Sequence, residues 1–264
     1  MHALSSYSIK TVFHRCTESP THRFIVSGQR KRIENTMAKA NSDDDEYSKR
    51  WEIMWNGGNQ DYEVKNGDGG ALKPGQSFDA GRSCPQLDIF LEQNKGMLEG
   101  GTAVIPGCGR GYDVATFSKY CKEVVGLELA PTAVASAQEY LGDSYKNVSV
   151  ILGDFLKDTG KTQYDIGYDY TFFCALHPDM RDSWASSWAA NIRPEGLLIT
   201  LIFPVLPEEL RGQAGPPWPV WPELYSEYLE KHGFSLHSLE KVPDSGSHPG
   251  REGKEYIGVW KRMG

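Results

Sequence analysis

The regular alternation of short apolar runs with helical segments, between residues 102 and 242, is the feature that most constrains the fold. The segments between the runs place apolar side chains on one helical face. Such alternation predicts an α/β domain with a doubly wound, mostly parallel sheet. The last two runs, 234–242 and 256–260, predict an antiparallel hairpin at one edge. The other expected strands cover residues 102–106, 123–129, 148–152, 164–173 and 197–203, and the expected helices cover residues 47–55, 85–95, 112–119, 131–140, 178–191 and 222–232.

Composition narrows the class of protein. The 264 residues carry a formal net charge of −7, which disfavours nucleic-acid binding because no basic cluster follows residue 32. No run of 18 apolar residues is present, so we expect no membrane contact. The five cysteines are widely separated and form no CxxC pair, which argues against a disulfide framework or a metal site. We therefore expect a cytoplasmic, monomeric domain that acts on a small molecule.

Residues 1–36 differ from the rest of the chain, because they contain six lysine or arginine residues and only two acidic residues. This composition is typical of an organelle transit peptide. Two other interpretations stay open, a disordered extension and a true start at Met37. We accordingly divide the chain into an extension, residues 1–46, and a domain, residues 47–264.

A glycine-rich loop, Ile105–Asp113, joins the strand expected at 102–106 to a helix. Gly107, Gly109 and Gly111 allow the backbone to turn sharply and let a ligand approach it closely. In an open α/β sheet, ligands bind beyond the carboxyl ends of the strands. We therefore expect this loop to bind a cofactor.

Acidic residues follow the next two expected strands. Glu128 lies about 20 residues after the loop, where a carboxylate accepts hydrogen bonds from ribose hydroxyls. Asp154 offers an acceptor for an adenine amino group, and Phe155 offers a ring for the base. Each acid alone also fits an ordinary role, at a helix N-terminus for Glu128 and in a turn for Asp154. Together with the loop, they predict an adenosine site.

A nicotinamide dinucleotide is the main alternative cofactor, and the spacing disfavours it. The loop reads GxGxG followed by Tyr112 and Asp113, without the third glycine of the GxGxxG pattern. Asp113 would also repel a pyrophosphate at the helix N-terminus. A cofactor that carries a sulfonium and an ammonium but no phosphate tolerates these acids.

These motifs resemble those of the class I S-adenosylmethionine-dependent methyltransferases, whose sheet is Rossmann-like. Within that class, the chain is most similar to the thiopurine methyltransferase superfamily, and especially to its plant and fungal thiol/halide methyltransferases. The resemblance covers roughly residues 47–262 and implies S-adenosylmethionine as the cofactor. It is carried by the glycine loop and by residues 51–55, 78–82, 126–128, 154–155, 169–175, 180–185, 215–217, 251–254 and 260.

The resemblance implies an aromatic lid. Trp51 and Trp55 match the N-terminal tryptophans that close over the cofactor, where an indole face attracts a sulfonium by ~0.5–2 kcal/mol. Phe78 stands where the family often has a third tryptophan, which keeps an apolar wall but loses an indole N–H. The loop before it is longer than in the plant enzymes. The resemblance therefore indicates the identity of the cofactor more firmly than the identity of the acceptor.

The resemblance also implies roles at the strand ends, where Glu128 replaces the commoner aspartate of the family. The implied contacts are Gly107 and Gly109 with the methionine part, Glu128 with the ribose, Asp154 and Phe155 with the adenine, and Tyr170 beside the cofactor near the acceptor.

Methyl transfer is an in-line displacement, and a soft anion such as a thiolate, bisulfide or halide needs no general base. We expect such an acceptor; another sulfur, oxygen or nitrogen acceptor is the alternative. An acceptor that arrives protonated needs a base, for which Asp79, Asp169 and His177 are candidates. Arg251 and Lys254 either attract an anionic acceptor or belong to a surface turn.

Three further interpretations concern residues outside these motifs. Cys108 and Cys174 are expected to pack rather than to react, because no histidine–acid pair adjoins either thiol. The proline-rich segment 214–222 either lines the acceptor site or binds a partner as a polyproline II helix. A cofactor-binding protein without catalysis remains an alternative, which the intact loop and acids disfavour.

Overall fold

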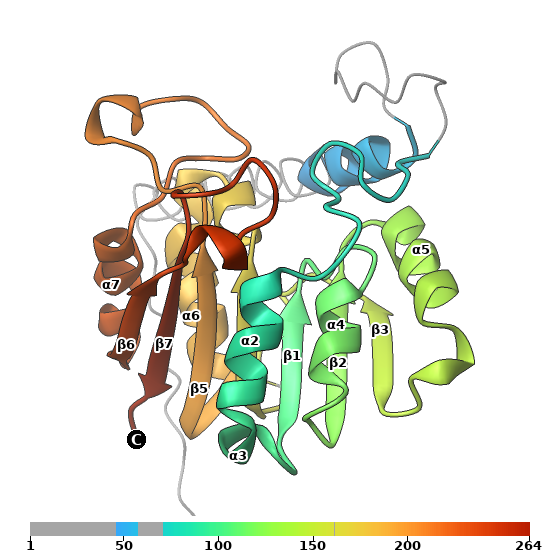
Figure 1. Cartoon of the computed structure of the whole chain (residues 1–264), viewed down its shortest axis with the longest axis horizontal. Helices are drawn as coiled ribbons and strands as arrows, with labels where there is room; N and C mark the ends of the chain where they lie inside the picture. Colours follow the sequence, from blue (N-terminus) through green and yellow to red (C-terminus); the bar gives the residue numbers. More distant parts are fainter. Residues whose placement is uncertain (1–45, 58–70, 161) are drawn as a thin grey trace, which may run out of the picture. The chain divides into compact units, whose positions relative to one another are not determined.

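The computed structural model describes residues 46–57, 71–160 and 162–264. Contacts divide the chain into Met1–Tyr47 and Ser48–Gly264, and the second unit contains a seven-stranded sheet of order β3-β2-β1-β4-β5-β7-β6. Strand β7 pairs antiparallel with both β5 and β6, while the strands from β3 to β5 pair in parallel (Figure 1). The mostly parallel sheet with an antiparallel C-terminal hairpin is thus confirmed. The strands are β1 (Thr102–Pro106), β2 (Glu123–Glu128), β3 (Val148–Leu152), β4 (Tyr164–Tyr170), β5 (Ile192–Ile202), β6 (Phe234–Lys241) and β7 (Tyr256–Arg262).

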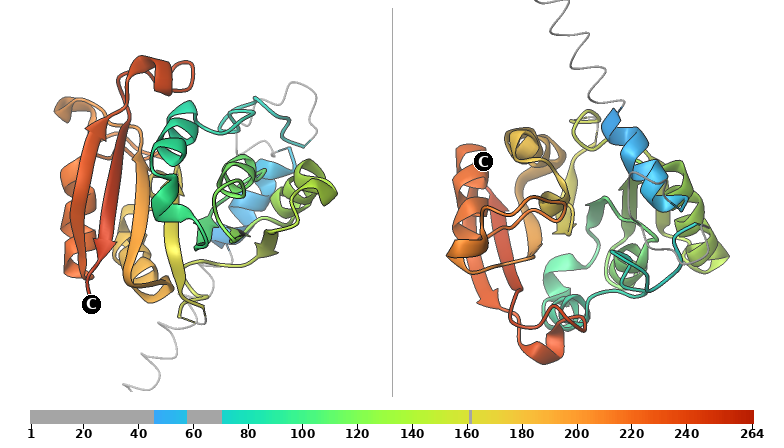
Figure 2. Two further views of the ribbon diagram at one scale, coloured as in Figure 1. Left: turned by 60° about the horizontal axis from the view of Figure 1, so that its bottom comes forward. Right: turned by 90° about the horizontal axis from the view of Figure 1, so that it is seen from above.

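Helices cover both faces of the sheet. From β1 the strand order runs outward in two directions, and right-handed crossovers then put the connecting helices on opposite faces. Figure 2 shows α2 and α4 on one face and α6 and α7 on the other. Besides a helix at residues 46–55, they are α2 (Pro85–Gln93), α3 (Lys95–Leu98), α4 (Tyr112–Phe117), α5 (Pro131–Leu141), α6 (Arg181–Asn191) and α7 (Pro222–Lys231).

Proline starts three of the helices, α2, α5 and α7. Its fixed φ angle suits the first helical turn. The N–H that proline lacks would have no acceptor within the helix at that position. The strands between the helices are apolar because the central ones are covered on both faces. In β5, for example, Leu198, Ile199, Leu201 and Ile202 are fully buried.

Most expected elements end within two residues of their predicted bounds, and three differ by three or more residues at one end. Strand β4 stops at Tyr170 rather than at residue 173, because Phe173 begins a 3₁₀ turn and its N–H donates to the Asp169 side chain. The helix expected from residue 178 begins as a 3₁₀ turn, Pro178–Met180, before α6. Strand β5 starts at Ile192 instead of residue 197, since the exposed residues 193–195 separate the buried Ile192 from the apolar run that follows.

No helix in the described ranges is long and apolar enough to cross a bilayer. The expectations for residues 1–45, including the transit peptide and the start at Met37, lie outside the residues that the structure describes.

Candidate active site

The carboxyl ends of β1, β2, β3 and β4 meet at one edge of the sheet, since these neighbouring strands are parallel. The chain leaves β1 toward β2 on one side, while β4 lies on the other side of β1. This reversal of strand order is where open α/β sheets leave room for a ligand. The glycine loop, Glu128, Asp154 and Tyr170 all lie at this edge.

The glycine loop has the left-handed backbone that its sequence predicts. Gly107, Gly109 and Gly111 have φ angles of 60°, 52° and 83°. A Cβ atom on Gly107 would lie 2.8 Å from the Phe172 ring, so a side chain cannot be placed there without moving that ring. Both the φ angle and the close approach therefore require glycine.

Glu128 is buried at the end of β2 and accepts three backbone hydrogen bonds. Its Oε2 atom accepts from the Gly109 N–H at 3.0 Å, and its Oε1 atom accepts from Leu129 and Ala130 at 2.8 and 3.2 Å. A carboxylate has about four acceptor sites, so one is left for a further donor. Burial raises the pKa of Glu128, while the three N–H donors favour the charged form.

Asp154 and Phe155 follow β3, and both have protein partners. Asp154 accepts from the Leu156 N–H at 3.0 Å, as a turn residue does, and its other oxygen is 3.3 Å from the Lys157 ammonium. The Phe155 ring is buried and packs 4.5 Å from Trp188. Asp154 therefore acts as a turn residue, which was the alternative interpretation of its position. Its side chain remains 28% exposed.

An aromatic cluster lies on the glycine loop. Trp51 and Trp55 meet Phe78 edge to face, with ring centroids 5.9 and 5.5 Å apart. Trp55 is buried, and its indole lies 3.2 Å from where a Cβ of Gly109 would be. The three residues expected to form the lid are thus together, and we call Trp51, Trp55 and Phe78 the aromatic lid.

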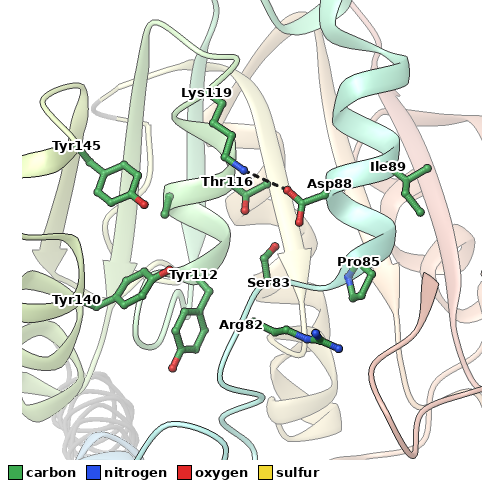
Figure 3. A pocket seen from close by; sticks show the side chains of 11 residues that line it. Arg82, Ser83, Pro85, Asp88, Ile89, Tyr112, Thr116, Lys119, Tyr140 and Tyr145 are labelled. Atoms are coloured by element: carbon green, nitrogen blue, oxygen red, sulfur yellow. Dashed lines mark hydrogen bonds and ion pairs between the residues drawn. The ribbon is translucent and has the colours of Figure 1, made fainter. Parts of the chain in front are cut away.

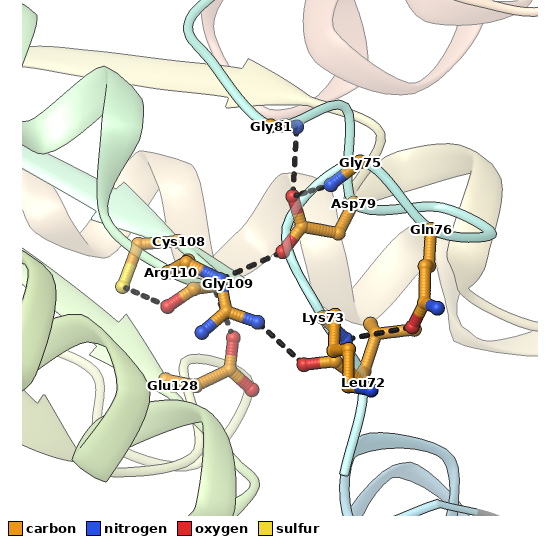
Figure 4. A network of polar contacts seen from close by, with 10 residues as sticks. All are labelled: Leu72, Lys73, Gly75, Gln76, Asp79, Gly81, Cys108, Gly109, Arg110 and Glu128. Atoms are coloured by element: carbon orange, nitrogen blue, oxygen red, sulfur yellow. Dashed lines mark hydrogen bonds and ion pairs between the residues drawn. The ribbon is translucent and has the colours of Figure 1, made fainter. Parts of the chain in front are cut away.

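A buried ion pair, which the sequence did not indicate, joins the glycine loop to the segment around Phe78 (Figure 4). The Arg110 Nε atom donates to Asp79 at 2.8 Å, and its Nη2 atom donates to the Leu72 carbonyl at 2.6 Å. The second oxygen of Asp79 accepts from the Gly81 N–H at 2.8 Å. Asp79 is therefore committed to structure and is not available as a general base.

Tyr170 lies at the end of β4 within a polar cluster from the C-terminal loop. Its hydroxyl donates to Glu255 at 2.7 Å and accepts from Arg251. The His248 ring stacks on it with centroids 6.1 Å apart, and the buried Nε2 atom of His248 has no hydrogen-bond partner among the described residues. Burial and the nearby arginines lower the pKa of His248 to about 4, so this ring is neutral at pH 7.

Glu255 and His248 were missed by sequence reasoning. Glu255 is fully buried, and burial raises its pKa. The signal that could have found it is its position directly before the last expected strand, one residue after Lys254 and four residues after Arg251.

The other two candidate bases also have partners elsewhere. Asp169 is buried and accepts from the Trp184 indole at 2.7 Å and from the Phe173 N–H at 3.2 Å. Burial raises its pKa to about 6. His177 is exposed and accepts from the Asp179 N–H, so it caps a helical turn. Asp169 is thus a structural acid, and His177 is a helix-entry residue.

The thiols show no sign of activation. Burial raises the pKa of Cys174 to about 12 and that of Cys108 well above its ordinary value. A reactive cysteine requires the opposite change, because the thiolate is the nucleophile.

The proline-rich segment is bonded to the same end of the sheet. The Trp218 N–H donates to the Cys174 carbonyl at 2.7 Å, and Val220 forms a bridge with Val205 after β5. Hydrogen bonds of this kind fix the segment on the domain, which is compatible with lining the acceptor site.

A separate open pocket of about 440 Å³ lies between α2 and α4 (Figure 3). Tyr112, Tyr140 and Tyr145 line it, together with the exposed ion pair of Lys119 and Asp88. None of the nine residues predicted to contact the cofactor lines this pocket.

Comparisons with known proteins agree with this geometry. The fold resembles that of a TehB-like SAM-dependent methyltransferase from Corynebacterium glutamicum, with a TM-score of 0.52 and 16% identity over 70% of this chain and 91% of that one. The sheet is therefore that of a Rossmann-like methyltransferase. Residues 74–261 match the family model of thiopurine S-methyltransferase.

Curated relatives agree with the family model. The chain is 35% identical to thiocyanate methyltransferase 1 of Arabidopsis thaliana over 188 residues, which are 70% of this chain and 79% of the relative. It is also 35% identical to probable thiol methyltransferase 2 of the same plant, with equal coverage. The chain belongs to the thiopurine S-methyltransferase family and is an S-adenosylmethionine-dependent methyltransferase.

Proposed function

We propose that this enzyme transfers the methyl group of S-adenosylmethionine to a small, soft sulfur or halide nucleophile by direct in-line displacement. The observation that carries this proposal is that Asp79, Asp169 and His177 are all engaged in structural contacts. An acceptor that is already an anion does not require any of them. The relatives named as thiocyanate and thiol methyltransferases point to the same class of acceptor.

The residues at the strand ends fit an adenosine that carries a positive sulfonium. Glu128 has one acceptor site left for the ribose, and the partly exposed Asp154 carboxylate would accept from the adenine amino group. Gly107 and Gly109 present no side chain to the methionine part, and the Trp55 indole lies against Gly109. When bound, S-adenosylmethionine supplies an electrophilic methyl group on a positively charged sulfur.

The acceptor is proposed to bind on the β4 side, next to Tyr170. Arg251 donates to the Tyr170 hydroxyl and lies over the Phe203 ring, so it provides a positive charge for an anion. The aromatic lid excludes water, which removes hydration from the nucleophile and strengthens electrostatic contacts. The protein thus aligns the reactants rather than moving a proton.

Calorimetry with S-adenosylmethionine, S-adenosylhomocysteine and NAD tests the cofactor. We expect the first two to bind and NAD not to bind, and we expect Asp154→Ala to weaken binding. Product analysis with labelled methyl groups then tests the acceptor among bisulfide, iodide, thiocyanate, small thiols and thiopurines. If none of these is methylated while the cofactor binds, the acceptor is an oxygen or nitrogen nucleophile and the proposal is wrong.

A further inference from the structure

Arg110 connects parts of the protein that are far apart in the sequence. It belongs to the glycine loop, yet its guanidinium bonds to Asp79 and to the Leu72 carbonyl, 31 and 38 positions earlier in the chain. It also lies 5.7 Å over the ring of Trp55. One side chain of the proposed cofactor loop therefore contacts both segments that carry the aromatic lid.

The contacts around Arg110 are shielded from water. The side chains of Arg110 and Asp79 are only 10% and 1% exposed, so solvent weakens their attraction little. The network also continues beyond the pair, since the Leu72 N–H donates to the Trp55 carbonyl at 2.9 Å. A planar guanidinium holds two acceptors in a fixed geometry, which a flexible ammonium does not.

The residue directly before Arg110 faces the other side of the loop. The Gly109 N–H donates to Glu128, the proposed ribose acceptor (Figure 4). Asp79 neutralises Arg110, so the guanidinium leaves little net charge to repel a cationic cofactor. The loop thus contacts the lid segments through Arg110 and the proposed ribose acceptor Glu128 through the preceding residue, Gly109.

We propose that Arg110 is a positioning residue that latches the aromatic lid onto the glycine loop, so that cofactor binding and lid closure stabilise each other. The inference rests on the proposed function, because it concerns the same cofactor site. It assigns to Arg110 no contact with the reacting atoms.

Removing the guanidinium tests the latch. We expect Arg110→Met to raise the Kd of S-adenosylhomocysteine by about 10-fold or more, since a hydrogen bond to a charged group is strong. Arg110→Lys restores part of the affinity, because it keeps the charge but not the two-point geometry. Combining Arg110→Met with Asp79→Asn is expected to weaken binding no further than the stronger single variant, since both break one network. Lys119→Met, which removes an exposed cation in the turn after α4, is the matched control and leaves the Kd unchanged.

Hydrogen exchange separates a latch from a general loss of stability. In the wild type, S-adenosylhomocysteine should slow the hydrogen exchange of the Leu72 and Gly81 amides. In Arg110→Met, saturating S-adenosylhomocysteine should leave the exchange of these amides unchanged. Equal affinity of wild type and Arg110→Met would overturn the latch alone, as would weaker binding accompanied by faster exchange throughout β1 and β4. A wild type that binds no S-adenosylhomocysteine would instead overturn the proposed function.

Discussion

Single residues at the strand ends serve the fold and the proposed site together. Glu128 was predicted as a ribose acceptor, and it also fixes the glycine loop and the start of α5 through three N–H donors. Its burial is tolerable because those donors replace water around the charge. Removing this carboxylate should therefore affect ligand and loop at once.

We predict that Glu128→Ala weakens binding of S-adenosylhomocysteine by roughly 10- to 100-fold, because a hydrogen bond to a charged group contributes about 1.5–3 kcal/mol. Titration calorimetry measures this change. Glu123→Ala is the control, since Glu123 is exposed at the opposite end of the same strand. Unaltered affinity in Glu128→Ala would contradict the assignment.

Close contact between elements positions α6 against the sheet. Trp188 of α6 packs so tightly on β4 that a Cβ atom at Gly167 would lie 2.3 Å from the indole. Trp184, one turn earlier, donates to the buried Asp169. These contacts hold the end of β4, and with it Tyr170, in place.

We predict that Gly167→Ala lowers the free energy of unfolding by about 1–3 kcal/mol, because the added methyl group overpacks the interface with Trp188. Urea unfolding measures the loss. Gly96→Ala in α3 is the matched control, since no atom lies near its would-be Cβ and alanine favours a helix. A Gly167→Ala variant as stable as the wild type would show that the indole moves freely.

Two acids with raised pKa values make the stability of the whole molecule depend on pH. Burial raises the pKa of both Asp113 and Asp169 to about 6, above their ordinary value of 3.8. The folded state therefore binds protons more tightly than the unfolded state between these values. The stability that these acids contribute is fully present below pH about 4 and is lost as the pH rises through about 6.

We predict that Asp113→Asn gains stability relative to the wild type as the pH rises from 4 to 7, by on the order of 1–3 kcal/mol. The amide cannot ionise and can still accept from Ser83, whose hydroxyl donates to Asp113 at 2.7 Å. Urea unfolding across this range measures the difference, and the comparison at pH 4 is its internal control. A constant difference at every pH would mean that burial does not hold this carboxyl protonated.

Local patterns predicted the elements that carry the site. Strands β1 and β3 match their predicted bounds, because apolar runs between turn residues are a local signal. The start of β5 carried no such signal, since residues 193–195 are exposed and only Ile192 of this stretch pairs with β4 before the register shifts. The sequence likewise predicted that Gly107, Glu128 and Asp154 lie at strand ends. It did not predict which protein groups bond to the two carboxylates.

The sequence by itself determined the doubly wound sheet, the glycine loop at its carboxyl edge and the class of enzyme. The sheet and the loop depend on periodicity and on neighbouring residues, which act over one or two turns of chain, and the class of enzyme follows from the resemblance of the motifs to a known family. Only the tertiary structure decided the partners of polar and charged side chains, such as Arg110 with Asp79 and Tyr170 with Glu255. Such pairs form because burial removes water from both groups, so that each needs a partner within the protein. The two residues lie far apart along the chain, and the sequence around either one therefore does not predict the pairing.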